Sequence, residues 1–182
     1  MDIYYPSKYR MKPIRFQDGR IRYAMSGNSR GWMRDPPAYI HPRILFGSGM
    51  ALTTEFIQKH SITHVLNCAF DEDCPSWFRE QSPKNYRCLN AVDSMDVNIL
   101  DWYNSFETTI MGFLRDDDCK NVYVHCQCGI NRSGFLCLNF MVKKLKIDVT
   151  ESIKAILRQR PCALTNPSFR HQVIQNAIMN VN

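Results

Sequence analysis

The chain has 182 residues, of which 45% are hydrophobic and 22% charged, a composition that fits a single globular domain with an ordinary core. No segment approaches the ~18 consecutive apolar residues of a membrane-spanning helix, and the first residues lack the apolar stretch of a secretory signal. The formal net charge is +6, and residues 1–40 carry most of it, with eight basic and three acidic side chains.

Residues 1–37 mix proline, glycine, serine and arginine with aromatic residues and show no sustained period. We interpret them as a basic N-terminal arm, separate from a domain at 38–182, with a short strand near Arg20–Met25 and a boundary at Pro36-Pro37. Such an arm can meet nucleic acid, an acidic partner or a phosphorylated surface, or it can be a solvated extension. Its aromatic residues suggest packing on its own domain or on a second subunit, so a homodimer formed through the arm is one hypothesis.

Beyond the arm, short apolar runs alternate with segments of helical period. We expect strands at Tyr39–Ile40, Ile44–Phe46, Ile62–Cys68, Tyr86–Ala91 and Asn121–His125, and helices at about 50–59, 98–115, 132–145, 150–159 and 167–179. The second helix has an N-cap at Asn98 and an apolar stripe made of Ile99, Tyr103, Phe106, Ile110 and Phe113. The last begins with an N-cap followed by proline, Asn166-Pro167. This alternation predicts an α/β fold with a central, mostly parallel twisted sheet of about five strands flanked by helices.

The eight cysteines do not follow a zinc-binding pattern, because the sequence has no Cys-x-x-Cys pair. In a chain of this length without a signal segment, reduced thiols in the cytoplasm are expected. We therefore predict neither a metal site nor a disulfide scaffold.

The most informative segment is Val122–Gly134, where an apolar strand delivers His125 and Cys126 to a short loop that opens directly into a helix. Successive backbone N–H groups of such a loop can form an anion-binding nest, and the helix N-terminus adds positive potential on the same side. Gly129 gives the loop the backbone freedom that its curvature requires. The residues expected to bind a phosphate are Gln127, Cys128, Gly129, Ile130, Asn131 and Arg132, with His125 in support.

A thiol at the mouth of this nest is stabilised as the nucleophilic thiolate by the helix dipole and by an adjacent arginine. Thiolate Cys126 can attack phosphorus while Arg132 holds two oxygens in a bidentate fork. Ser133 can hydrogen-bond the sulfur and help it leave when the phospho-cysteine is hydrolysed. Fixed donors meet the developing charge, so this chemistry calls for no metal and no cofactor. The alternative is a buried structural cysteine near a solvated arginine, which the surrounding order of strand, glycine and helix disfavours.

The run from His125-Cys126 to Arg132-Ser133-Gly134 resembles the signature loop of the cysteine-based protein tyrosine phosphatase superfamily. Residues 38–180 resemble its small dual-specificity branch, through Pro42–Ser48, Ile62–Asn67 and Asn166–Phe169 followed by Gln172. Asn131 and the Asn-Pro-Ser-Phe run look most like poxviral members, which would place the protein in the host cytoplasm or the virion. The resemblance implies the cysteine-phosphatase fold, a phospho-cysteine intermediate and a phosphorylated protein as substrate.

The resemblance also implies that an aspartate before the long helix protonates the leaving group. Asp93 and Asp96 both precede Asn98, and the spacing of the family, five residues before that asparagine, selects Asp93. Asp96 is then a charge at the helix start, and Asp101 lies on the helix surface.

Two weaker features stay open at this point. Cys128 either fills a small space or forms a reversible disulfide, and Cys68 is either a core thiol or an alternative redox partner of the nucleophile. Arg158 and Arg160 either contact a second phosphate on the substrate or complement the end of their helix.

Three functions compete for this site. The first is a protein phosphatase acting on phosphotyrosine and on phosphoserine or phosphothreonine. The second is an RNA 5′-triphosphatase, which the basic arm and Asn131 would suit, although such relatives carry Thr-His where this chain has Gln127-Cys128. The third is a non-catalytic phosphate-binding or structural module, which would not need a nucleophile. The sequence therefore favours a phosphorylated protein over nucleic acid as the partner.

Overall fold

The computed structural model describes residues 11–15, 21–25 and 36–179. Within the first two segments, β1 (Met11–Arg15) pairs in antiparallel register with β2 (Ile21–Met25). The predicted strand near Arg20–Met25 is therefore present, and it has a partner that the sequence did not reveal. Arm residues 1–10, 16–20 and 26–35 lie outside the described ranges, and the hypotheses on arm packing and on a dimer formed through the arm stay predictions.

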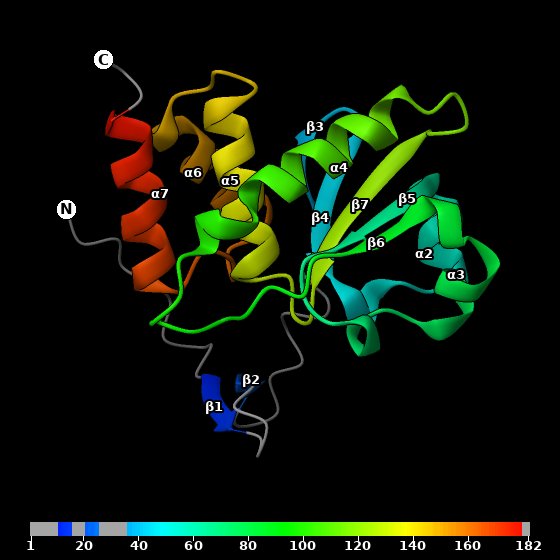
Figure 1. Ribbon diagram of the computed structural model, residues 1–182, viewed down its shortest axis with the longest axis horizontal. Coiled ribbons are helices and arrows are strands. Elements are labelled where there is room, and N and C mark those ends of the chain that lie inside the picture. Colours follow the sequence, from blue (N-terminus) through cyan, green and yellow to red (C-terminus); the bar gives the residue numbers. More distant parts are fainter. Residues whose placement is uncertain (1–10, 16–20, 26–35, 180–182) are drawn as a thin grey trace.

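A five-stranded sheet forms the centre of the following domain (Figure 1). Its strands are β3 (Ala38–His41), β4 (Ile44–Ser48), β5 (Ile62–Asn67), β6 (Tyr86–Cys88) and β7 (Asn121–Cys126), in the spatial order β3-β4-β7-β5-β6. All neighbours are parallel except β3 and β4 at one edge, which confirms the predicted sheet. Strand β6 ends before the predicted Ala91, because Asn90 takes a left-handed conformation with φ 54° and turns the chain.

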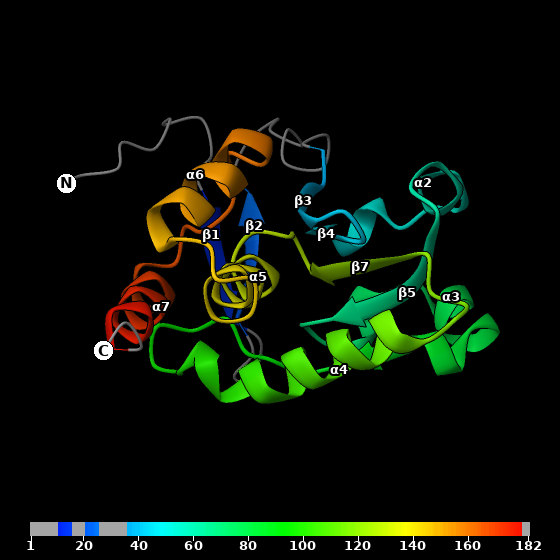
Figure 2. The same ribbon diagram turned by 90° about the horizontal axis from the view of Figure 1, so that it is seen from above.

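The helices of the domain surround this sheet. They are α2 (Thr54–Lys59), α3 (Ser76–Gln81), α4 (Tyr103–Arg115), α5 (Arg132–Lys143), α6 (Val149–Gln159) and α7 (Pro167–Met179), with short 3-10 turns at Gly49–Ala51, Asp71–Asp73, Pro83–Asn85 and Ile99–Trp102. In both views, α5, α6 and α7 gather on one side of the molecule, and α2 and α3 lie on the other (Figures 1 and 2). None of these helices combines the length and the apolar character that crossing a bilayer requires.

Alternating side chains of the strands build two separate cores. Leu45 and Tyr123 face one way and pack with residues of α2 and α3. Phe46 and Val124, one position along each strand, face the other way and pack with α4, α5 and α7. The apolar stripe predicted for the long helix is buried in this second core as a whole. Because both faces are covered, the strands read as continuous apolar runs.

One expected helix begins later in the structure, and one helix was not expected. The first begins at Thr54 rather than near residue 50, because Ser48 still belongs to β4 and the turn Gly49–Ala51 follows it. Thr53 caps this helix, with its hydroxyl accepting from the N–H of Phe56 at 3.2 Å. Helix α3 was not predicted, since its six residues are too few for a helical period and no side chain caps its start.

Two other helix starts follow the predicted caps closely. Asn98 accepts from the N–H of Leu100 at 3.1 Å, although the chain makes a 3-10 turn before α4 begins. Asn166 accepts from the N–H of Ser168 at 3.0 Å and so caps α7 as predicted. These two asparagines fix where the segments on both sides of the candidate site enter their helices.

Candidate active site

The candidate site lies at the carboxyl ends of the three central parallel strands. Ser48 at the end of β4 pairs with Cys126 at the end of β7, and the N–H of Cys68, just beyond β5, donates to the His125 carbonyl at 2.7 Å. Helix α5 begins six residues after Cys126, at Arg132. The strand-loop-helix order predicted for Val122–Gly134 is therefore present, at the edge where open parallel sheets bind their ligands.

The loop between Cys126 and α5 is held in place by hydrogen bonds that its carbonyl oxygens accept. Those of residues 127–130 each accept a hydrogen bond: Ser48 Oγ donates to Gln127 at 2.9 Å, Arg160 Nη2 to Cys128 at 2.9 Å, Arg160 Nε to Gly129 at 2.7 Å, and Leu164 N to Ile130 at 2.8 Å. In a planar trans peptide unit, the N–H of the next residue points the opposite way. The N–H groups of residues 128–131 therefore face away from these donors, toward the concave side of the loop, as an anion-binding nest requires.

Gly129 lets the loop approach β4 closely. Its φ is 63°, in the left-handed region, and a Cβ at this position would overlap the backbone of Gly47 and Ser48. A side chain would therefore be strained both by the backbone conformation and by a contact that no rotamer relieves.

We expect Gly129→Ala to lower the free energy of unfolding by about 3 kcal/mol or more, because the methyl group meets fixed backbone. Urea denaturation measures this value. The matched control is Gly112→Ala in α4, where a Cβ has no heavy atom within 4 Å. That change is expected to raise stability by about 0.5–1 kcal/mol, because alanine favours the helix. Equal stability of wild type and Gly129→Ala would contradict the expectation.

Cys126 and Arg132 lie buried at the two ends of the loop. The hydroxyl of Ser133 donates to the Cys126 sulfur at 3.3 Å. Arg132 Nη1 donates to the Ala91 carbonyl at 3.1 Å, and its Cζ lies 5.9 Å from the centre of the Phe70 ring. Burial alone would lower the pKa of Arg132, but the negative charges of Cys126, Asp93 and Asp73 together raise it. The guanidinium is thus held as a cation beside the thiol.

The Nε of Arg132 is buried and has no hydrogen-bond partner within residues 36–179. A buried donor without a partner is costly, at about 1–3 kcal/mol. An anion seated in the loop is the kind of ligand that would satisfy it.

Asp93 is tied to the loop by two amide side chains. Asn131 Nδ2 donates to one carboxylate oxygen at 3.2 Å, and Asn166 Nδ2 donates to the other at 3.0 Å. The Asn131 oxygen in turn accepts from the N–H and the hydroxyl of Thr165 and from the N–H of Asn166. Asp96, by contrast, is exposed and accepts only a long hydrogen bond of 3.5 Å from Ser94. Of the two predicted aspartates, the structure brings Asp93 to the loop.

His125 is fully buried beneath the site. Its Nδ1 lies 3.3 Å from the Cys126 carbonyl, and its Nε2 has no hydrogen-bond partner in the described part of the chain. Burial disfavours the charged ring and lowers the pKa of His125 from 6.5 to about 4. The histidine is therefore a neutral part of the fold at neutral pH.

The lowered pKa of His125 predicts that the folded state becomes less stable as the pH is lowered. Above pH 6.5 His125 is neutral in both states; between pH 6.5 and about 4 the unfolded chain binds a proton that the folded chain does not. The free energy of unfolding should therefore decrease over that window, with a contribution from His125 of about 3 kcal/mol. Urea denaturation from pH 7 to pH 4 measures the slope.

The slope should be shallower in His125→Gln than in wild type. The control is His171→Gln, which changes an exposed histidine of α7 and should leave the slope as in wild type. If the slope for His125→Gln equalled that of wild type, the lowered pKa of His125 would not contribute to the pH dependence of stability.

The model of the dual specificity phosphatase catalytic domain matches residues 44–178, from the start of β4 nearly to the end of α7. The chain belongs to the dual specificity phosphatase family. The match includes the whole loop, Asp93 and the segment around Asn166.

Relatives and solved structures agree with this membership. Human dual specificity protein phosphatase 4 is 30% identical over 141 residues, which cover 76% of this chain and 34% of that protein. Mouse dual specificity protein phosphatase 19 is 28% identical, covering 74% of this chain and 59% of that protein. The chain thus spans about a third of the length of the phosphatase 4 proteins it matches. The resemblance to poxviral members stays a prediction.

Two human crystal structures show the same fold as this dual specificity phosphatase domain. DUSP28 has a TM-score of 0.67 at 17% identity, covering 81% of this chain and 96% of that one. The tyrosine phosphatase-like serine/threonine/tyrosine-interacting protein has a TM-score of 0.63 at 20% identity, covering 82% and 100%. At these identities the likeness concerns the fold alone.

The thiols that were predicted as redox candidates are both buried in the phosphatase domain. Burial raises the pKa of Cys128 to about 12, with the negative charge of Cys126 adding to the effect. Burial also raises the pKa of Cys68 well above its usual value. Both thiols are free in the structure, and their redox roles stay predictions.

The two arginines at the end of α6 have different surroundings. Arg158 is exposed, and its predicted contact with a second phosphate stays a prediction. Arg160 is 1% exposed and donates to the loop carbonyls, so it neither faces the substrate side nor serves only its own helix end. The prediction that grouped it with Arg158 was wrong, because positions two apart lie on nearly opposite sides of a helix.

Several residues of the phosphatase site were not predicted from the sequence. They are Ser48, which holds the loop; Phe70 and Asp73, which lie near Arg132; Asn166, which was predicted only as a cap; and Arg160. The position of Ser48 at the end of a parallel strand was a usable signal, since ligand sites gather there. The others act across long stretches of sequence, and no local pattern marks them.

Proposed function

We propose that this domain is a metal-independent phosphatase that hydrolyses phosphotyrosine and phosphoserine or phosphothreonine in proteins through a phospho-cysteine on Cys126. The observation that carries the proposal is the set of fixed donors around the thiol. Inward-facing N–H groups of the loop and the unpaired Nε of Arg132 fit the equatorial oxygens of a phosphoryl group.

The proposed reaction uses one residue for each task. The Cys126 thiolate attacks phosphorus as the bond to the leaving oxygen breaks, and Arg132 holds the equatorial oxygens. Asp93 gives its proton to the leaving oxygen and then takes a proton from the water that attacks the phospho-cysteine. The sulfur departs as a thiolate, which the Ser133 hydroxyl stabilises at 3.3 Å. Phosphate is released and the enzyme returns to its initial state.

Protein substrates are favoured over RNA. The relatives above are named as protein phosphatases, and the loop carries Gln127-Cys128 beside a candidate acid held in place by two amides. The eight cysteines, all in the described residues, are free thiols, which supports a reducing compartment such as the cytoplasm.

A substrate panel tests the proposal. Wild-type protein would be given a phosphotyrosine peptide, a phosphothreonine peptide and 5′-triphosphorylated RNA, with EDTA present. We expect release of phosphate from both peptides and a phospho-enzyme, trapped by acid, whose label maps to Cys126. Turnover of RNA alone would replace the protein phosphatase with the RNA enzyme. Absence of turnover on all three, with phosphate still bound, would support a binding module.

We also propose that Cys68 protects the nucleophile as a reversible disulfide. The ends of β5 and β7 lie side by side, with the Cys68 N–H on the His125 carbonyl, which brings the two cysteines to neighbouring positions. Hydrogen peroxide would oxidise Cys126 to a sulfenic acid, and the Cys68 thiol would displace water from it. Mass spectrometry should then find a Cys68–Cys126 peptide. A Cys126–Cys128 peptide, or sulfinic acid alone, would exclude Cys68.

A further inference from the structure

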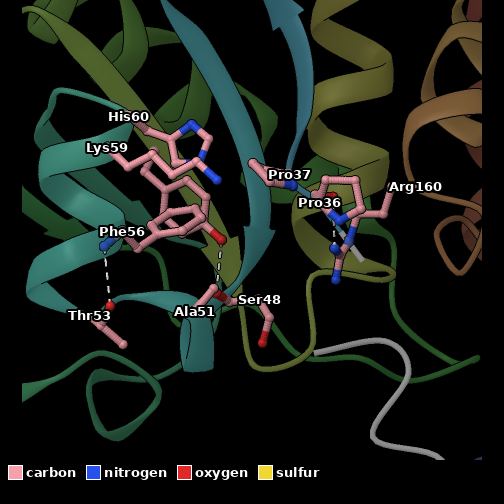
Figure 3. Close-up of a pocket in the computed structure, with 10 residues that line it drawn as sticks. Pro36, Pro37, Ser48, Ala51, Thr53, Phe56, Lys59, His60 and Arg160 are labelled. Carbon is pink, nitrogen blue, oxygen red and sulfur yellow. Dashed lines mark hydrogen bonds between the residues drawn. The ribbon is translucent and has the colours of Figure 1, made fainter. Parts of the chain in front are cut away.

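Arg160 connects three parts of the chain with one buried guanidinium. It lies at the end of α6 and is 1% exposed. Its Nε donates to the Gly129 carbonyl at 2.7 Å, its Nη2 to the Cys128 carbonyl at 2.9 Å, and its Nη1 to the Pro36 carbonyl at 3.2 Å. Figure 3 shows the side chain beside Pro36, with the bond between them drawn. An arginine fork is rigid, so it fixes the relative positions of the groups it binds.

The direction of the two loop carbonyls that Arg160 binds, those of Cys128 and Gly129, affects how the loop binds an anion. Their peptide units carry the N–H groups of Gly129 and Ile130, which point to the opposite side. Turning either carbonyl inward would remove a donor from the nest and place a negative dipole at the phosphate position. Gly129 is the residue for which such a turn is easiest, since glycine has the widest range of backbone conformations.

We propose that Arg160 is a positioning residue for the phosphate site: from behind the loop, it sets the direction of the N–H groups of Gly129 and Ile130. The inference rests on the proposed phosphatase function and adds to it a residue that does not touch the substrate. Ser48 and Leu164 hold the carbonyls on either side, so Arg160 supports the middle of the loop.

A cavity borders this residue. It has a volume of about 380 Å³ and is lined by α2, by the Pro36-Pro37 segment and by Ser48, Tyr123 and Arg160. In Figure 3, Phe56, Lys59 and His60 form one wall and the two prolines lie near Arg160 at the other. Guanidinium ion is therefore a suitable probe for the space that a shortened side chain at position 160 would leave beside this cavity.

The test measures phosphate binding and turnover separately. The variants are Arg160→Ala, Arg160→Lys, which keeps the charge but not the fork, and Lys154→Ala, which changes an exposed side chain of the same helix. The readouts are kcat and KM for a phosphotyrosine peptide and the inhibition constant of inorganic phosphate. Circular dichroism melting reports whether each variant is folded.

We expect Arg160→Ala to bind phosphate at least about tenfold more weakly, since charge-assisted hydrogen bonds are lost from the nest. Its kcat/KM should fall by about 10²-fold, as for other small misplacements of catalytic groups. Low-millimolar guanidinium chloride, but not the same concentration of sodium chloride, should recover turnover several-fold. Arg160→Lys should stay close to the alanine variant, and Lys154→Ala should match wild type.

Full activity and phosphate affinity in Arg160→Ala would overturn the inference, and so would a lysine variant equal to wild type. If the alanine variant does not fold, Arg160→Gln replaces it, because the glutamine amide keeps one donor and fills more space. An inactive wild-type protein that binds no phosphate would refute the proposed function itself. If wild type is active and Arg160→Ala changes neither turnover nor phosphate affinity, this inference alone is refuted.

Discussion

Replacing Cys126 by serine is expected to lower kcat by roughly 10⁴–10⁶-fold, the range seen when a catalytic nucleophile is removed. A serine hydroxyl needs a general base to become a nucleophile. The neighbouring imidazole, His125, is buried, lies with its Nδ1 against the Cys126 carbonyl and has a pKa of about 4. This histidine is therefore not placed to take a proton from a hydroxyl at position 126. Turnover of a phosphotyrosine peptide measures the loss.

Binding should survive this substitution. The loop N–H groups and Arg132 remain, so phosphate or a phosphopeptide should bind Cys126→Ser about as tightly as wild type. The control is Cys119→Ser, the same chemical change at a buried thiol near the end of the sheet opposite the loop. It is expected to leave kcat unchanged. Comparable turnover by wild type and Cys126→Ser would end the case for a cysteine phosphatase.

Asp93→Asn should lower kcat by about 10²–10⁴-fold for substrates with a poor leaving group, such as a phosphothreonine peptide, because it removes the proton donor. The effect should be much smaller with p-nitrophenyl phosphate, whose leaving group departs well without a proton. This dependence on the leaving group separates loss of an acid from general damage to the site. Parallel assays of the two substrates provide the measurement.

The matched control is Asp96→Asn, three residues away and exposed. We expect it to behave like wild type with both substrates, since its carboxylate is exposed and accepts a long hydrogen bond of 3.5 Å from Ser94. A leaving-group effect in Asp96→Asn, but not in Asp93→Asn, would reverse the assignment of the acid. An equal loss with both substrates in Asp93→Asn would indicate a structural role instead.

The parts of the site that the sequence predicts are those with local patterns. Cys126, Gly129 and Arg132 lie within seven residues, between an apolar strand and a helix, so their geometry follows from the chain itself. The caps Asn98 and Asn166 were predicted for the same reason. Helix α3 was missed because six residues carry too little periodicity to recognise.

The supporting contacts are not local, which is why the sequence did not reveal them. Asn166 reaches Asp93 across 73 residues, and Arg160 reaches Gly129 across 31. Asn166 reads as an ordinary cap and Arg160 as an ordinary charge at a helix end, and each has a second role only after folding. Tertiary contacts of this kind need a structure.

Asn131 joins the loop, the acid-bearing segment and the start of α7 through a single side chain. The last of these segments follows Cys126 in the chain and is therefore synthesised after it. A nascent chain that stops before Thr165 would hold the thiol and the arginine but lack the Asn166 donor and the three groups that orient Asn131. The network around Asp93 is therefore complete only when the start of α7 has joined the body of the domain.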